Sequence, residues 1–272
     1  MKYLFYDIET VPNEEVDWKP PEDKPDAFPP IPAHRIVSIA GMLMTIEEKN
    51  GPPLKNQVLW FGNFGDPKEG ERSMILEFLE MLDEHGPTLV SYNGRGFDLP
   101  VIEHRCMRFG IQCPYLFEWN LRNRYKEQGH IDMQDMLSNF GASMRSQLAV
   151  ICQAIGMPGK MDVDGSKVDE LIQNGEQQTV DSYCLCDVGE LAWLFVRWLH
   201  MKGDISKVTN HNAIHSIKAG MQQKYDEMVN QLIERTNIQR LSLEERDEQL
   251  AEAGKASILQ EGDEEEDPDI PF

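Results

Sequence analysis

The chain has 272 residues, 40% of them hydrophobic, and a formal net charge of −21 at pH 7. This length suffices for one large α/β domain with an appendage, or for two small domains. No apolar run is long enough to cross a bilayer, and the first residues lack the basic and apolar regions of a secretory signal. We therefore expect a cytoplasmic protein with no membrane partner.

The positions of the acids and the cysteines limit the kinds of binding site that the chain is expected to hold. Seven acids lie among the last 12 residues. Such an acidic chain is a poor candidate for tight, nonspecific DNA binding, but its charge is compatible with a site that collects divalent metal ions. The five cysteines include no Cys-x-x-Cys pair, which favours reduced thiols over a zinc site.

In chain order, an apolar strand at 2–9 precedes a proline-rich loop that extends to residue 32. Hydrophobic periodicity then predicts strands at 35–46, 57–61, 88–92 and 130–133, and helices at 69–85, 98–109, 143–155, 165–174 and 177–200. The inward face of the first of these helices is expected to carry Met74, Ile75, Phe78, Leu79 and Leu82. This order predicts an α/β fold, in which a mixed five-stranded sheet is flanked by helices on both faces.

The composition becomes more polar after the last of these helices. Residues 204–254 predict a C-terminal helical extension with helices at 205–236 and 242–253. Residues 255–272 predict a disordered acidic tail. We therefore expect three parts: an α/β domain at 1–203, the extension and the tail.

Asp7 and Glu9 lie at the end of the first predicted strand. Residues two apart in a strand point to the same face, so these two carboxylates can share one hard divalent cation. The alternative for this pair is an acidic turn at the end of a strand.

Two further acids occupy helix positions. Tyr183 and Asp187 are four residues apart, so a helix brings the phenol and the carboxylate to one face. A solvated helix pair is the alternative. Asp98 opens a helix after the loop 93–97, whose glycines let the backbone approach a ligand closely. The alternative for Asp98 is a plain helix N-cap.

Taken together, these segments resemble the three exonuclease motifs of the DEDD superfamily, in the same order. The segments are Phe5-Tyr6-Asp7-Ile8-Glu9-Thr10, Asn93-Gly94-Arg95-Gly96-Phe97-Asp98 and Tyr183-x-x-x-Asp187. A tyrosine four residues before the last aspartate marks the DEDDy branch of these DnaQ-like enzymes. Over roughly residues 1–200, the chain resembles most strongly the stand-alone exonucleases related to the proofreading domain of family-B DNA polymerases.

The resemblance implies a ribonuclease H-like fold and a metal-dependent 3′–5′ exonuclease with two Mg²⁺ or Mn²⁺ ions, about 3.5–4 Å apart. It implies that Asp7 bridges both ions, that Glu9 and Asp187 complete the first site, and that Asp98 holds the second. Tyr183 is expected to orient the attacking water, because a phenol with an ordinary pKa near 10 is a poor general base at neutral pH. The alternatives are an enzyme that trims RNA 3′ ends and a catalytically inactive binding scaffold.

Basic and aromatic residues alternate between residues 95 and 126. The basic residues are Arg95, Arg105, Arg108, Arg122, Arg124 and Lys126. Such a mixture suits a single strand, through phosphate contacts and base stacking. We expect nucleic acid with a free 3′ end, preferably single-stranded DNA, to be bound by Asn93, Arg95, Phe97, Arg122, Arg124 and Lys160. The alternative is an ordinary solvated helix and loop.

Three other residues are candidates for supporting roles. Trp18 and Phe28 in the proline-rich loop are candidates for a stacking lid over the substrate. Asp132 either supports the site from behind or caps the next helix.

The chain ends in Glu-Glu-Glu-Asp-Pro-Asp-Ile-Pro-Phe, which resembles the terminal peptide of bacterial single-stranded DNA-binding proteins. The resemblance implies docking onto replication or repair proteins that bind that peptide, through Asp269, Ile270, Pro271 and Phe272. The phenylalanine would anchor in an apolar pocket, and its carboxylate would pair with a basic side chain. The alternative is a tail that only increases solubility.

Overall fold

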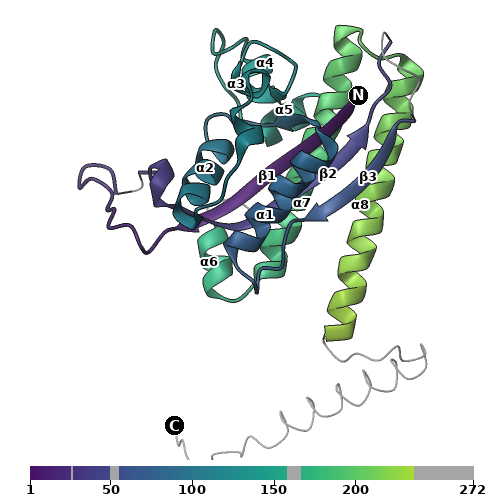
Figure 1. Ribbon diagram of the computed structural model, residues 1–272. Helices are drawn as coiled ribbons and strands as arrows, with labels where there is room; N and C mark the ends of the chain where they lie inside the picture. Colours follow the sequence, from purple (N-terminus) through teal and green to yellow (C-terminus); the bar gives the residue numbers. More distant parts are fainter. Residues whose placement is uncertain (26, 50–54, 158–166, 236–272) are drawn as a thin grey trace, which may run out of the picture. The chain divides into compact units, whose positions relative to one another are not determined.

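The computed structural model describes residues 1–25, 27–49, 55–157 and 167–235 (Figure 1). The strands are β1 (Lys2–Pro12), β2 (His34–Thr45), β3 (Gln57–Asn63), β4 (Thr88–Ser91) and β5 (His130–Asp132). The α-helices are α1 (Glu71–His85), α2 (Asp98–Phe109), α3 (Trp119–Arg122), α4 (Met133–Leu137), α5 (Leu148–Ala154), α6 (Val168–Gln173), α7 (Gln177–Lys202) and α8 (Lys207–Arg235). Short 3-10 helices lie at Ile31–Ala33 and Pro114–Phe117.

The five strands form one mixed sheet in the order β3-β2-β1-β4-β5, which confirms the predicted fold class. The central strand β1 runs antiparallel to β2 and parallel to β4. The outer strand pairs continue this pattern on each side of β1: β2 and β3 are antiparallel, and β4 and β5 are parallel. A parallel pair needs a crossover connection, and α2 lies in the connection between β4 and β5.

The strand β1 is longer than its predicted range of 2–9. Its pairing with β2 shifts register between Glu9 and Thr10 and then continues to Pro12, because Val11 is buried against the neighbouring layer. Asp7 therefore lies inside a strand, and Glu9 lies beside an irregularity in it, rather than at a strand end.

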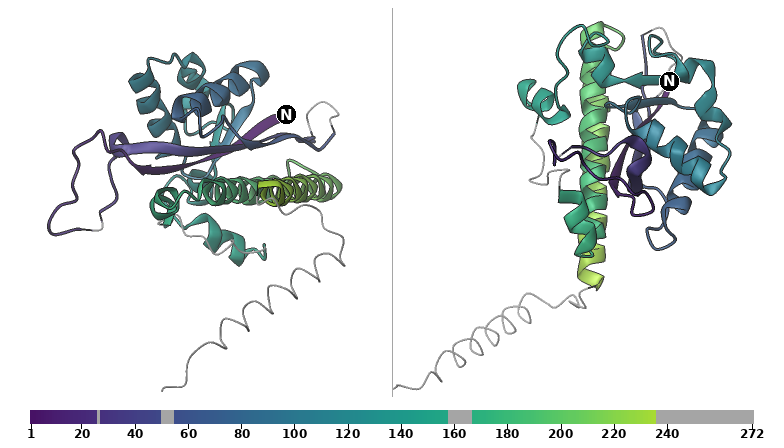
Figure 2. Two further views of the ribbon diagram at one scale, coloured as in Figure 1. Left: turned by 90° about the horizontal axis from the view of Figure 1, so that it is seen from below. Right: turned by 90° about the vertical axis from the view of Figure 1, so that its left-hand side faces the viewer.

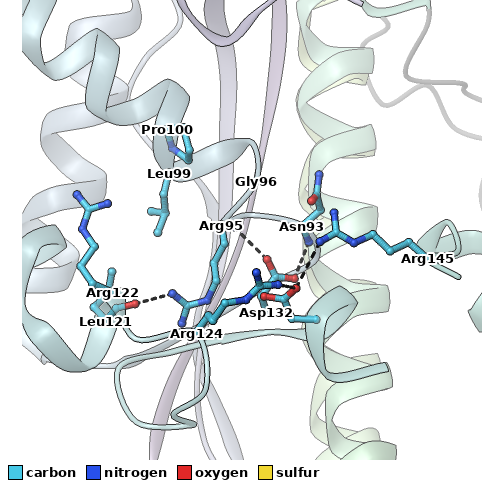
Figure 3. Close-up of a pocket in the computed structure, with 11 residues that line it drawn as sticks. Asn93, Arg95, Gly96, Leu99, Pro100, Leu121, Arg122, Arg124, Asp132 and Arg145 are labelled. Atoms are coloured by element: carbon cyan, nitrogen blue, oxygen red, sulfur yellow. Dashed lines mark hydrogen bonds and ion pairs between the residues drawn. The ribbon is translucent and has the colours of Figure 1, made fainter. Parts of the chain in front are cut away.

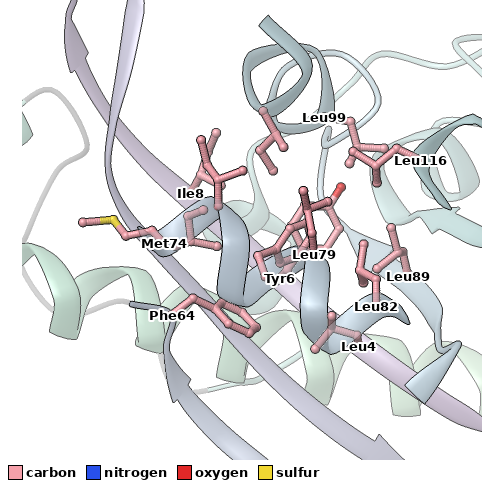
Figure 4. Packing of buried hydrophobic residues seen from close by; sticks show 14 of the residues in the cluster. Leu4, Tyr6, Ile8, Phe64, Met74, Leu79, Leu82, Leu89, Leu99 and Leu116 are labelled. Atoms are coloured by element: carbon pink, nitrogen blue, oxygen red, sulfur yellow. The ribbon is translucent and has the colours of Figure 1, made fainter. Parts of the chain in front are cut away.

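Helices cover both faces of the sheet (Figure 2). The predicted inward residues of α1 are all buried: Met74, Ile75, Phe78, Leu79 and Leu82. They belong to the same core cluster as Leu4, Tyr6 and Ile8 of β1 (Figure 4). On the opposite face, Phe195 of α7 packs against Phe5, with ring centroids 5.5 Å apart. The alternation along β1 thus supplies apolar side chains to both layers.

The long helix α7 confirms the helix predicted at 177–200 and extends it by two residues. Gly203 ends the helix with a φ of 88°, a left-handed conformation that glycine adopts without steric cost. The first part of the next helix, α8, contacts the edge strand β3, where the backbone N–H of Val58 donates to Ser216 Oγ at 3.0 Å. Such a contact occupies a backbone donor that an edge strand would otherwise expose.

Two predicted helices differ from the structure in their bounds. The helix predicted at 143–155 begins only at Leu148, because the preceding chain is held in a turn. Asn139 and Phe140 have positive φ there, and the carbonyl of Ser146 accepts a 2.5 Å hydrogen bond from the Tyr92 hydroxyl. The helix predicted at 165–174 is observed over Val168–Gln173, and residues 165–166 lie outside the described residues.

The predicted division at residues 203 and 254 stays a prediction. Residues Met1–Lys224 form one compact unit, and a second unit begins at Tyr225, within α8. The helix predicted at 242–253 and the tail at 255–272 lie outside the described residues. Among the helices that the structure describes, none is both long and apolar enough to cross a membrane.

Candidate active site

The acids of β1 face the helix α7. Donor atoms of Asp7, Glu9 and Cys184 all lie within 4.8 Å of one another. The Cys184 thiol donates to the backbone carbonyl of Asp7 at 3.4 Å and lies 3.7 Å from its Oδ2 atom. The predicted sharing of one face by Asp7 and Glu9 is therefore present, although both sit within the sheet.

Cys184 is a donor in this cluster rather than a ligand for a hard cation. Burial raises the pKa of its thiol well above the usual value, and the charges of Asp7, Glu9 and Asp187 raise it further. A neutral thiol is a poor partner for Mg²⁺, whereas carboxylate oxygens are the donors that such ions prefer. The donor set therefore fits a divalent cation held by the carboxylates.

Asp187 and Tyr183 come to the cluster on one uninterrupted helix. Tyr183 is buried and lies one turn before the half-buried Asp187 in α7. Cys184 and Asp187 are three residues apart, so the contact of Cys184 with β1 brings Asp187 to the same side of the helix. The predicted spacing of Tyr183 and Asp187 on a helix is confirmed, and their catalytic roles stay predictions.

Asp98 approaches β1 from α2. It is the first residue of that helix and is buried, and its carboxylate accepts from the backbone N–H of Ile8 and from its own. Ile8 lies between Asp7 and Glu9, so Asp98 meets the strand at the level of the other two acids. Burial raises the pKa of Asp98 to about 7, and the nearby charge of Asp132 acts in the same direction. A bound cation would favour its ionised form.

Asp132 holds the loop that leads into Asp98. Its Oδ1 accepts from the backbone N–H of Asn93 at 2.8 Å, and its Oδ2 accepts from that of Arg95 at 3.0 Å. Oδ1 also accepts from the N–H of Gln134 at 3.0 Å, at the start of α4. The predicted helix cap is therefore confirmed, and the same carboxylate also fixes the loop 93–97. A role of Asp132 in supporting the site stays a prediction.

Close packing explains a glycine in this loop. A Cβ atom on Gly94 would lie 2.5 Å from Ser91 Oγ and 2.6 Å from the Tyr6 hydroxyl oxygen. The backbone N–H of Gly94 donates to Ser91 Oγ at 3.2 Å. Only glycine lets the chain pass here, so the close approach is to the protein's own side chains.

Aromatic rings gather beside Asp98. The ring of Phe28 lies 5.5 Å from that of Phe97 and 4.9 Å from that of His34, measured between centroids. Phe28 comes from the proline-rich loop and is 71% exposed. The two predicted contacts Phe28 and Phe97 thus lie together, and Trp18 is half-buried in the same loop.

The members of the predicted basic run lie in different places. Arg95, Arg122 and Arg124 line one pocket, together with Asn93 from the predicted binding residues, whereas Lys126 is exposed outside its lining. Arg105 does not belong with them, because it is buried and donates to Glu71 through Nε at 2.8 Å and through Nη2 at 2.6 Å. Arg108 pairs with Glu15 at 2.9 Å on the surface. Lys160 and the tail residues 269–272 lie outside the described residues.

Cys184, Arg145 and Asp135 were not predicted as site residues. Cys184 had a usable signal, because it lies three residues before Asp187 and so shares a helix face with it. Arg145 and Asp135 had none, since the pocket that they line is built from separate segments of the chain.

Residues 26–236 match a family profile described as predicted 3′–5′ exonuclease related to the exonuclease domain of PolB. The match includes Asp98, Tyr183 and Asp187 and begins after Asp7 and Glu9. No curated protein matches the sequence.

One solved structure to which the chain is similar is the family B DNA polymerase from the hyperthermophilic archaeon Pyrobaculum calidifontis. The TM-score is 0.51 with 18% sequence identity, over 82% of this chain and 29% of the polymerase chain. This likeness shows the fold, an α/β fold of the ribonuclease H-like exonuclease kind. Since the family profile matches more than half of its residues, the chain belongs to the family of predicted 3′–5′ exonucleases related to the exonuclease domain of PolB.

Proposed function

We propose that the protein is a metal-dependent 3′–5′ exonuclease of the DEDDy type, which removes nucleotides from the 3′ end of single-stranded DNA. The observation that carries this proposal is the convergence of Asp7 and Glu9 with α7, where donor atoms of both acids lie within 4.8 Å of each other and of Cys184. Exonuclease domains of this kind use divalent metal ions, and a carboxylate cluster suits them.

The proposed roles follow from the position of each side chain. Asp7, Glu9, Asp98 and Asp187 would hold two divalent ions, Mg²⁺ or Mn²⁺. When bound, such ions neutralise charge on the phosphoryl oxygens and increase the acidity of water. Tyr183, one helical turn from Asp187, would orient the attacking water through its hydroxyl. Cys184 keeps Asp7 in place by donating to its carbonyl.

The aromatic rings support a single-stranded substrate. Phe28 is exposed beside Phe97, and Phe97 directly precedes Asp98 in the chain. Bases of a single strand are free to stack on such rings, whereas paired bases are not. We therefore propose that Phe28 and Phe97 hold a base near the 3′ end, with His34 packed behind them.

The test is a time course on oligonucleotides labelled at the 5′ end, so that loss from the 3′ end appears as a ladder of shortened products. Single-stranded DNA, duplex DNA and single-stranded RNA of one sequence should each be incubated with Mg²⁺, Mn²⁺ or EDTA. We expect a metal-dependent ladder, fastest on single-stranded DNA. A faster ladder on RNA would indicate the trimming enzyme instead. Intact substrates in every metal would indicate the inactive scaffold.

The C-terminal residues Asp269–Phe272 carry a separate proposal, which rests on the sequence alone. We propose that they recruit the protein to replication or repair partners that bind the same terminal peptide. Deletion of residues 261–272 should abolish co-precipitation of such partners and leave hydrolysis of naked DNA unchanged. Undiminished co-precipitation would contradict this role.

A further inference from the structure

A basic pocket lies beside the loop that leads into Asp98 (Figure 3). Its volume is about 300 Å³. Four arginines from three parts of the chain line it: Arg95, Arg122 with Arg124, and Arg145. In a chain with a net charge of −21, such a concentration of guanidinium groups suggests a site for an anion.

Two acids also line the pocket, and both are already engaged. Asp132 accepts three backbone N–H groups and fixes the loop. Asp135 pairs with Arg124 at 2.5 Å and lies 3.7 Å from Nη2 of Arg145. One buried carboxylate therefore faces two guanidinium groups, and Arg145 is half-exposed with only a long contact. Arg122 also pairs with Glu103, at 2.8 Å. Three carboxylates therefore face the four arginines, and the lining keeps a small excess of positive charge.

Two arginines of the lining, Arg95 and Arg124, each have a buried Nε donor with no acceptor in the part of the chain that the structure describes. The other end of the Arg95 group donates to the carbonyls of Leu121 and His130, at 2.8 and 2.6 Å. Both Nε atoms are closed to solvent, so an anion in the pocket would be bound by the outer guanidinium nitrogens of the partly exposed Arg122, Arg124 and Arg145.

Leu99 and Pro100 of α2 and Leu121 of α3 line the pocket as well. A bare inorganic ion would leave these apolar side chains without a partner, whereas a sugar or base attached to a phosphate would contact them. We propose that the pocket is a phosphate-binding site for a nucleotide, with the phosphate on the arginines and the organic part against α2. Asn93 and Gly96 of its wall belong to the loop that positions Asp98.

The bound phosphate has two sources: a phosphodiester of the strand being hydrolysed, or a free nucleoside 5′-monophosphate, the expected product. The choice between these two ligands rests on the proposed exonuclease function, but the presence of the site does not. The rival explanation is a purely structural ion-pair network, in which Arg124 and Arg145 serve only to neutralise Asp135.

Asp135→Asn separates these explanations, because it removes the competing carboxylate. A phosphate site should then bind several-fold more tightly, since two arginines are released to the ligand. Arg145→Gln should weaken binding by roughly ten- to a hundredfold, the loss of one charge-assisted hydrogen bond pair. Arg108→Gln on α2 is the matched control, because Arg108 is exposed and pairs with Glu15 outside the pocket.

The experiment is calorimetric titration of the full-length protein in EDTA, which removes metal ions and stops hydrolysis. The ligands are inorganic phosphate, deoxyadenosine 5′-monophosphate and a 12-nucleotide single strand of thymidine. Because no turnover occurs, the result of this titration does not depend on whether the protein is an exonuclease.

We expect Arg145→Gln to weaken, and Asp135→Asn to strengthen, binding of at least one ligand that contains a nucleotide. An effect on the mononucleotide identifies the product as the ligand, and an effect on the strand alone identifies the substrate backbone. If the two variants bind as the wild type does, or if Arg108→Gln causes the same loss as Arg145→Gln, the pocket is not a phosphate site. Weaker binding by a folded Asp135→Asn protein would also refute it.

Discussion

Asp132 joins the loop 93–97 to α4, so its replacement tests how the protein positions Asp98. The carboxylate is 2% exposed and accepts the N–H groups of Asn93, Arg95 and Gln134. At about 1 kcal/mol for each hydrogen bond, Asp132→Ala should lower the free energy of unfolding by about 3 kcal/mol.

A milder variant gives the same test without gross loss of structure. Asp132→Asn keeps one oxygen but turns an amide NH₂ toward a backbone N–H, most directly that of Arg95, so about 1–3 kcal/mol should be lost. The rate of hydrolysis should fall in both variants, because the loop no longer fixes Asp98 against Ile8.

The assays are urea unfolding and single-turnover cleavage of a labelled strand. The matched control is Asp83→Ala, which removes an exposed acid from α1. Asp132 has no positioning role if Asp132→Ala unfolds at the wild-type urea concentration and cleaves at the wild-type rate. A loss of stability with full activity would show that Asp132 acts only as a helix cap.

Three further predictions concern separate side chains. Tyr183→Phe should reduce the cleavage rate by about 10²-fold, because only a water-orienting hydroxyl is lost; a wild-type rate would exclude that role. Phe28→Ala should raise KM for a single strand more than Met201→Ala, a change at an equally exposed apolar residue, and equal effects would argue against stacking. Burial, and to a lesser extent the charge of Arg95, lowers the pKa of His130 well below 6.5 in the folded protein. Just below pH 6.5 the imidazole is therefore protonated in the unfolded chain but not in the folded one, so acidification lowers the free energy of unfolding. In urea unfolding below pH 6.5, the wild type should lose about 1.4 kcal/mol more per pH unit than His130→Gln, and parallel pH profiles would contradict this.

Hydrophobic periodicity alone predicted the direction of a side chain where that direction depends only on the helix or strand that carries it. It identified the inward face of α1 and the common face of Asp7 and Glu9, because helices repeat every 3.6 residues and strands every two. It also placed Tyr183 and Asp187 on one helix. These predictions needed no knowledge of neighbouring elements.

Features made by distant segments could not be predicted in this way. The buried pair of Arg105 and Glu71 looks in the sequence like two surface charges, and only packing of α1 against α2 removes them from solvent. The contact of Asp98 with the Ile8 backbone also depends on how α2 meets β1. The proximity of Arg145 to Asp135 could not be predicted either, because it depends on how two separate segments of the chain pack.

The central claim is that the carboxylates gathered at β1 hold the metal ions that hydrolyse a 3′-terminal phosphodiester bond. Its most direct test is the cleavage rate of Asp7→Asn beside that of Asp83→Asn, on a 5′-labelled single strand with saturating Mn²⁺. We expect loss of all detectable shortening in Asp7→Asn, with an unchanged thermal unfolding curve, and a wild-type rate in Asp83→Asn. Wild-type shortening by a folded Asp7→Asn protein would contradict the claim.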